Sequence, residues 1–287
     1  MGDELLAWFD VPALRTVAAG TALLGLVAGA VGCFAVLRRQ SLQGDVVSHA
    51  ALPGVALAFL LGGRSAVVLV VGGAVAGWVA LLLVGVVGRR SRVPTDAALG
   101  GALAVFFGLG LALMRYAQSL PGAAANPLDR YLFGQAANLR TSDLGVIGGA
   151  GAVTLLVLVL VWKELKLFAF DPEYAASLGL PVRRLDLLLT TLTVVAVVIG
   201  LKAVGVVLMT ALLVAPAVAA RQWTDRLGVM VILAAAFGLL AGVGGTVLAH
   251  YLGTKYADGV PTGPTIVLVA TGLVLVSLFF GTARSAT

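Results

Sequence analysis

The chain has 287 residues, of which 60% are hydrophobic and only 11% are charged, with a formal net charge of +6. A soluble domain carries about 25% charged residues, so this composition excludes an ordinary soluble protein. The basic residues flank apolar blocks instead of forming one polar face, which argues against nucleic-acid binding and favours anchoring at a membrane surface. A lone cysteine, Cys33, excludes a disulfide framework and a thiolate metal cluster.

Blocks of apolar residues follow one another along the whole chain and determine its fold class. A bilayer core of about 30 Å requires a helix of about 20 apolar residues. We therefore predict an all-α, multi-pass protein of the cell membrane, in contact with lipid, whose residues 1–287 form a single transmembrane domain. The nine predicted spans are 13–37, 45–62, 65–87, 96–116, 143–163, 185–200, 203–219, 227–250 and 263–282. The sixth and seventh are short and form either a tight helical pair or one bent segment; we treat them as two.

The distribution of Lys and Arg predicts the orientation of these spans. With the N-terminus outside, one side of the membrane collects 12 of the 19 basic residues, including the pairs at 38–39, 89–90 and 183–184. Basic residues concentrate in cytoplasmic loops. We therefore expect the N-terminus outside and the C-terminus in the cytoplasm.

The second predicted span carries the ionisable pair with the strongest functional signal. Asp45 and His49 are four residues apart, which stacks both side chains on one face of a helix. A carboxylate oxygen and an imidazole nitrogen on one face can bind a divalent cation. The alternative is an Asp–His hydrogen bond that only satisfies two groups near the membrane surface.

The neighbours of this pair fit a metal site. Gln43 and Ser48 are candidates for hydrogen bonds to the two ligands, and Pro53-Gly54 can kink the helix and free backbone carbonyls. A divalent ion needs about four ligands and one helix offers two, so a second copy of the chain meeting along this helix would complete the set. Affinity should fall at low pH, because a coordinating imidazole must be neutral.

Two further segments are candidates for contacts outside the bilayer core. His250 ends the eighth predicted span, where we expect it to face the outer water; contact with an ion at the outer mouth is the alternative. In the connection before the sixth span, Asp171 is placed as a helix N-cap, Pro172 as the first helical residue and Gly179 as the C-terminal cap. The resulting helix, within about 171–180, is either an interfacial loop or a docking helix, and its two caps favour docking.

The sequence contains no Gly-rich loop ending in Gly-Lys-Ser or Gly-Lys-Thr, and neither an HExxH nor a GxSxG motif. The chain is therefore not expected to bind ATP through a P-loop, or to be an enzyme of the usual intramembrane-hydrolase types. A membrane-bound hydrolase using Asp45 and His49 would lack a nucleophile motif.

Several stretches in order along the chain resemble the permease subunits of ATP-binding-cassette importers for manganese, zinc or iron. They are Gly44-Asp45 with Ser48-His49-Ala50 and Leu52-Pro53-Gly54; Tyr131-Leu132-Phe133-Gly134; Asp171-Pro172-Glu173-Tyr174-Ala175 with Leu178-Gly179; residues 204–208 with 211–217 and 219–221; and, more weakly, 261–268. His250 departs from the pattern, since relatives more often have Ser or Tyr thereabouts.

The resemblance implies a type II importer fold and a homodimer with the ion path at its two-fold axis. It implies two cytoplasmic ATPase subunits and an extracellular or periplasmic metal-binding protein as partners. It assigns metal contact to Asp45 and His49, and ATPase coupling to Asp171, Pro172, Glu173, Tyr174, Ala175, Leu178 and Gly179. It implies no permanently bound cofactor, only the transported ion.

Oxygen and nitrogen ligands suit Mn²⁺, Fe²⁺ or Zn²⁺, and the absence of thiol ligands argues against Cu(I). Two alternatives remain at this point. One is a secondary metal transporter driven by an ion gradient, with Asp45 and His49 as a proton relay. The other is an importer permease for siderophores or cobalamin, whose cargo would need a wide apolar path.

Overall fold

The computed structural model describes residues 11–63, 65–120, 139–255 and 260–281. Over these residues it contains eleven helices and no strand, which confirms the all-α prediction. Both chain termini and the 131–134 motif lie outside the described residues. The helices are α2 Pro12–Leu37, α3 Gln43–Leu60, α4 Ala66–Arg90, α5 Thr95–Ser119, α7 Thr141–Leu160, α8 Trp162–Phe170, α9 Pro172–Ser177, α10 Val182–Val204, α11 Val206–Arg221, α12 Leu227–Lys255 and α13 Thr262–Phe280.

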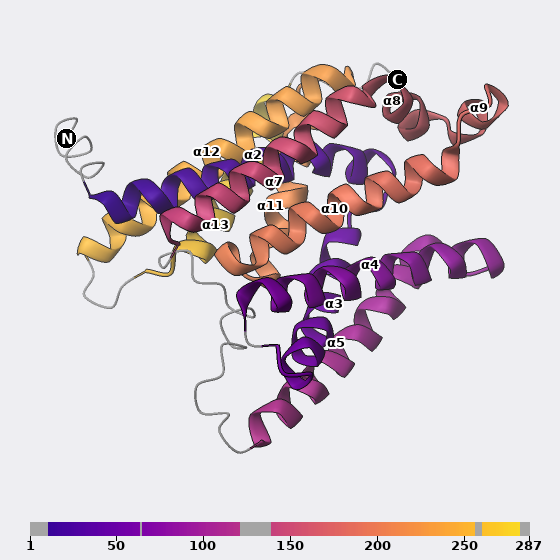
Figure 1. Cartoon of the computed structure of the whole chain (residues 1–287). Coiled ribbons are helices and arrows are strands. Elements are labelled where there is room, and N and C mark those ends of the chain that lie inside the picture. The colour runs from indigo at the N-terminus through magenta and orange to yellow at the C-terminus, as the bar shows by residue number, and fades with distance from the viewer. Residues whose placement is uncertain (1–10, 64, 121–138, 256–259, 282–287) are drawn as a thin grey trace.

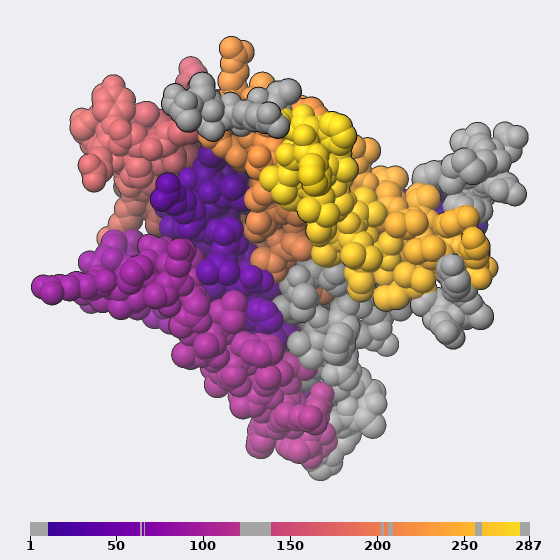
Figure 2. Space-filling model, turned by 180° about the vertical axis from the view of Figure 1, so that it is seen from behind, coloured from indigo at the N-terminus to yellow at the C-terminus, as the bar shows by residue number. Residues whose placement is uncertain are grey.

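The long helices form two groups with α10 and α11 between them (Figure 1). In one group α3, α4 and α5 pack on one another; in the other, α2 packs on α7 and α12, and α12 on α13. α10 contacts α2 and α7 on one side, and α3 and α4 on the other. Seen from behind, α4 and α5 project from the body that α12 and α13 cover, with α2 and α3 visible between them (Figure 2).

Seven of the described helices are long and apolar enough to cross a membrane: α2, α4, α5, α7, α10, α12 and α13. The predicted count of nine spans is therefore not confirmed, although a helix lies at each of the nine predicted segments. α11 has 16 residues, fewer than the roughly 20 that a bilayer core requires. α3 is the other predicted span outside these seven, and its 18 residues include the polar Gln43, Asp45 and His49.

The most extensive helix contact joins α2 to α12 along small residues, and we call it the α2–α12 seam. Its members are Thr21, Gly25 and Gly29 of α2 with Ala234, Gly238, Gly242 and Thr246 of α12. A methyl group on Gly25 would collide with the carbonyl oxygen of Gly238, and the converse also holds. Without side chains between them the backbones approach closely, which is how helices gain van der Waals contact in lipid. The hydroxyl oxygens of Thr21 and Thr246 lie 3.0 Å apart, and Thr246 donates to the Gly242 carbonyl at 2.8 Å.

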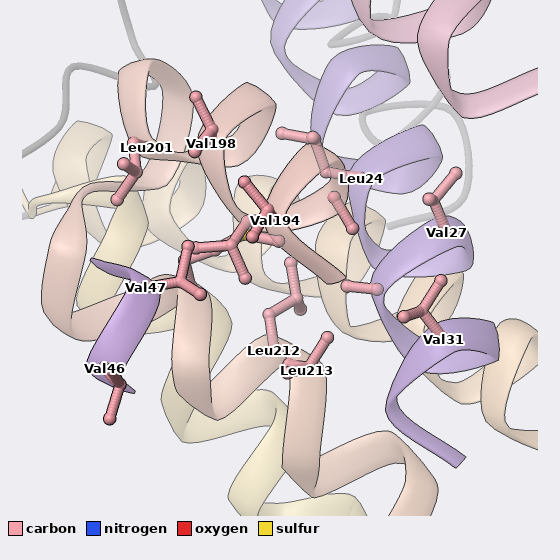
Figure 3. Packing of buried hydrophobic residues seen from close by; sticks show 14 of the residues in the cluster. Leu24, Val27, Val31, Val46, Val47, Val194, Val198, Leu201, Leu212 and Leu213 are labelled. Atoms are coloured by element: carbon pink, nitrogen blue, oxygen red, sulfur yellow. The ribbon is translucent and has the colours of Figure 1, made fainter. Parts of the chain in front are cut away.

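Aliphatic side chains fill the junction between the two groups of helices (Figure 3). They come from α2, α3, α10 and α11, and none is more than 6% exposed: Leu24, Val27, Val31, Val46, Val47, Val194, Val198, Leu201, Leu212 and Leu213. Because Val46 and Val47 belong to this core, the first turns of α3 are held against the helices around them.

The sixth and seventh predicted segments are two helices, α10 and α11, and a single residue separates them. The break lies at Gly205, not at the predicted link around 200–203. Gly205 has φ 88° and ψ 170°, a conformation that a side chain would strain. The apolar pattern alone did not distinguish this glycine from the many others in the spans.

Candidate functional site

α3 presents Asp45 and His49 on the one strip of its first half that is not fully buried. Between residues 43 and 56, all of which the structure describes, these two side chains are partly exposed and every other residue is buried. Asp45 lies in the first turn, where a carboxylate is favoured by the positive end of the helix dipole. The predicted shared face is therefore present, and it is open on a helix otherwise enclosed by protein.

The His49 imidazole is held by a ring contact. It meets the Phe107 ring of α5 edge to face, with centroids 4.8 Å apart and planes at 75°. Its Nδ1 atom is buried without a hydrogen-bond partner, and no hydrogen bond joins it to Asp45 within the described part of the chain. A buried nitrogen with no partner is costly, unless a ligand occupies it during function.

Two hydroxyl groups, one on α3 and one on α11, are also buried without a hydrogen-bond partner among the described residues. They are Ser48 Oγ of α3 and Thr210 Oγ1 of α11. The helices meet here through Gly44, where an added methyl group would lie 3.1 Å from Thr210 Cγ2 and 2.9 Å from Leu213 Cδ2. Thr210 was not among the predicted site residues; a hydroxyl within the apolar block 206–217 was the available signal.

The predicted supporting roles of Gln43 and Ser48 differ from what the structure contains. Gln43 Nε2 donates to Gln40 Oε1 at 2.8 Å, within the turn before α3, so it braces that turn instead of a ligand. Ser48 is fully buried, and its hydroxyl bonds to neither Asp45 nor His49. Gln43 and Ser48 are close to the predicted ligands in sequence but do not contact them, because successive residues of a helix point about 100° apart.

Pro53 lies inside α3, and the helix continues through it to Leu60. Proline has no N–H, so the backbone carbonyl four residues earlier, that of His49, has no intrahelical donor from this position. Gly110 of α5 packs closely here, since a methyl group on it would stand 2.9 Å from Pro53 Cδ. The proline therefore leaves a backbone oxygen next to the imidazole without ending the helix.

One copy of the chain does not complete a metal site. No group of three or more His, Cys, Asp or Glu residues that could hold an ion occurs in the residues described. Asp45 and His49 offer one oxygen and one nitrogen ligand, whereas a tetrahedral ion takes four and a harder ion six or more. The pair can form half of a site whose other half comes from elsewhere.

The predicted short helix before α10 is present as α9. Asp171 Oδ1 accepts a hydrogen bond from the Tyr174 backbone N–H at 2.9 Å, Pro172 is the first helical residue and Gly179 has φ 79°, which confirms both predicted caps. Among the seven residues assigned to coupling, Ala175 is buried and the other six are exposed. Tyr174 and Leu178 are each more than half exposed, so α9 presents large apolar side chains on its surface.

His250 lies far along the chain and in a different part of the fold from the Asp–His pair. It lines a cavity of about 450 Å³ between the start of α2, the end of α12 and the start of α13. Thr246, Thr254 and Thr262 are also on its wall, whereas Asp45 and His49 are not. Figure 1 shows the end of α12 opposite the end of the molecule that carries α9.

A model of the "ABC 3 transport family" matches residues 10–281. The "Zinc transport system membrane protein TroC" of Treponema pallidum is 46% identical over 281 residues, covering 98% of this chain and 93% of TroC. The "Manganese transport system membrane protein MntC" of Bacillus subtilis is 44% identical over 285 residues; these cover 99% of this chain but 64% of that longer protein. In the solved structure "PsaBC from Streptococcus pneumoniae in complex with Fab", one chain superposes with a TM-score of 0.82 at 32% identity, covering 99% of this chain and 98% of its own.

Proposed function

The chain belongs to the ABC 3 transport family, and from that premise we propose that it is the membrane subunit of an importer that moves Mn²⁺, Zn²⁺ or Fe²⁺ into the cytoplasm. A separate subunit hydrolyses ATP. The observation that carries the proposal is the strip of Asp45 and His49, partly exposed on a helix that is otherwise buried. The unpaired His49 Nδ1 supports a ligand role over an internal hydrogen bond.

A second copy of the chain completes the proposed site. Two copies related by a two-fold axis along α3 bring two carboxylates and two imidazoles together, which gives the four ligands that one copy lacks. The ion binds there in transit, between the α3 helices of the two copies, and leaves when these helices move apart. This arrangement needs no resident cofactor.

The partners of the proposed complex lie at opposite ends of the molecule. The exposed residues of α9 dock on the cytoplasmic ATPase, and a metal-binding protein delivers the ion on the outer side, near the cavity lined by His250. This orientation puts the N-terminus outside and the C-terminus inside. The Arg89 and Arg90 pair at the end of α4 and the α9 helix then both face the cytoplasm, as the distribution of basic residues requires.

We also propose that α3 and α11 lie at membrane depth in spite of their polarity and length. Both pack against helices that are long enough to span. Polar or short segments are tolerated in a bilayer where protein, not lipid, surrounds them. The strongly exposed apolar side chains are instead on outer helices, such as Val105, Val146, Ile232 and Leu268, where lipid would cover them.

The choice of cargo follows from ligand chemistry and from the relatives. One carboxylate and one imidazole from each copy accept Mn²⁺, Zn²⁺ and Fe²⁺ alike. The similar proteins are named for zinc and for manganese transport, so these two ions come first. Family membership favours ATP-driven transport over a gradient-driven carrier, and a small charged site fits a bare ion better than a siderophore or cobalamin.

Metal accumulation tests the proposal directly. Cells expressing this chain with its ATPase and binding protein are compared with cells carrying Asp45→Ala or His49→Ala, and Mn, Zn and Fe are measured by mass spectrometry. We expect uptake of one metal to collapse in both variants while the complex still assembles. Normal uptake in both variants would show that the pair is structural and that the assigned site is wrong.

A further inference from the structure

We propose that Arg38 is a positioning residue that transmits movement of α9 to the helix carrying Asp45 and His49. The inference rests on the proposed function, because it requires an ATPase that acts on α9 and an ion that binds α3. It concerns a residue outside both of those sites.

Arg38 connects three elements through its guanidinium group. It immediately follows α2, and its Nη2 atom donates to Asp186 Oδ1 of α10 at 2.8 Å. Its guanidinium carbon stands 4.4 Å from the centre of the Phe168 ring of α8, a cation–π distance. The Arg38 side chain is only 14% exposed, whereas the Asp186 side chain is 33% exposed, so the guanidinium side of the pair is the more shielded from water.

The two partners of Arg38 bracket α9. Phe168 lies three residues before the Asp171 cap, and Asp186 lies in the second turn of α10, after the Gly179 turn. Phe168 is 2% exposed, so the ring contact is anchored in the core. Asp186 is 33% exposed and follows the buried Leu185 on α10. A displacement of α9 that moves α8 or the start of α10 must therefore move Arg38 or break its contacts.

From Arg38 the chain reaches α3 through a short, bonded turn. Gln40 N–H donates to the Ala35 carbonyl at 2.8 Å, and Arg39 has φ 55°, the left-handed conformation that closes the end of α2. Gln43, the first residue of α3, bonds back to Gln40 by its backbone at 3.0 Å and by its side chain at 2.8 Å. Asp45 is two residues further on. Since few free torsions remain, a shift of Arg38 is passed to the ligand strip.

A second described ion pair provides a contrast and a control. Arg221 and Asp225 are 3.0 Å apart but join neighbours four residues apart, and the Asp225 side chain is 79% exposed. An exposed pair of that kind contributes little. Removing it should leave both stability and transport as they are, whereas Arg38 links segments 148 residues apart.

The experiment measures how much Mn²⁺ enters per ATP hydrolysed. The full complex of chain, ATPase and binding protein is reconstituted in vesicles with Arg38→Gln, with Asp186→Asn, with the double exchange Arg38→Asp and Asp186→Arg, and with the control Asp225→Asn. We expect the first two variants to assemble and to keep hydrolysing ATP. Their Mn²⁺ uptake per ATP should fall at least about fivefold, the lower range of coupling between sites. The double exchange should recover part of the loss.

Each outcome separates this inference from the proposed function. A wild-type complex without ATP-dependent uptake of Mn²⁺, Zn²⁺ or Fe²⁺ overturns both. Wild-type uptake with an unchanged ratio in the Arg38 and Asp186 variants overturns only the role of Arg38. If both single variants fail to assemble, or if uptake and hydrolysis fall by the same factor, Arg38 is a structural staple and the inference is wrong.

Discussion

Buried polar side chains have hydrogen-bond partners at the α2–α12 seam, whereas several in and around the first half of α3 have none among the described residues. At the seam the hydroxyl groups of Thr21 and Thr246 bond to each other and to backbone carbonyls. Around α3, Ser48 Oγ, His49 Nδ1 and, on α11, Thr210 Oγ1 are buried without partners among the described residues. An unsatisfied buried polar group costs about 1–3 kcal/mol. The contrast is the one that the proposed function requires, with a seam that stabilises the fold and an α3 that binds the ion.

The sharpest test of this contrast is His49→Phe, because phenylalanine keeps a ring for the edge-to-face contact with Phe107 and removes both nitrogen atoms. We expect metal uptake to fall by at least about 100-fold, since even the hydrogen-bond partners of metal ligands contribute about 10- to 100-fold to affinity. Thermal unfolding of the purified protein should occur at the same temperature or higher, because an unpaired buried nitrogen is removed. A lower melting temperature with normal uptake would reverse the assignment of the two regions.

The next largest effect is expected at the seam from Gly238→Ala. The added methyl group would collide with the Gly25 carbonyl, so the helices must separate. Overpacking of this kind costs about 1–3 kcal/mol in the free energy of unfolding. Uptake per assembled complex should stay near the wild-type value, as measured by the ion-uptake assay on protein that remains folded.

The matched control for that change is Gly272→Ala in α13, where no atom lies within 4 Å of the new methyl group. Its free energy of unfolding should stay the same or rise by up to about 1 kcal/mol, because alanine is favoured over glycine inside a helix. Equal destabilisation by the two substitutions would mean that the close backbone contact at the seam is not what stabilises this half of the molecule.

The smallest expected effect is the difference in stability between removing a bonded and an unpaired buried hydroxyl group. Thr21→Val, nearly the same in shape, removes a bonded hydroxyl and should lower the free energy of unfolding by about 0.6 kcal/mol, the average for such bonds between membrane helices. Ser48→Ala removes an unpaired hydroxyl and should be neutral or stabilising. Denaturation of the two purified variants under one condition gives the comparison. If Ser48→Ala is the more damaging, Ser48 has a partner during folding or function that the structure does not contain.

Much of the fold was predictable because the membrane imposes it. The first predicted span, 13–37, differs from α2 by one residue, since apolar blocks end where water begins. The short helix at 172–177 was also predictable, because its caps are local: Asp171 bonds to a backbone N–H three residues away, and Pro172 and Gly179 act through their own torsions.

The remaining features depend on segments distant in sequence. Nothing near Gly25 indicates that Gly238 lies against it, and an arginine after a span looks like any other basic anchor until Asp186 and Phe168 are beside it. The predicted metal pair depended on a spacing of four residues, which a helix translates directly into a shared face. The burial of Ser48 and Thr210 depends on how α3 and α11 pack in the fold, which the spacing of residues within one helix does not predict.

The seam also determines when the protein can finish folding. Thr21 and Thr246 are 225 residues apart, so at a synthesis rate of about 5–20 residues per second α2 waits roughly ten to forty-five seconds for α12. Throughout that interval the glycine face of α2 is in the membrane without the helix that matches it. The newly inserted α2 is therefore most open to pairing with a wrong helix in the interval before α12 arrives.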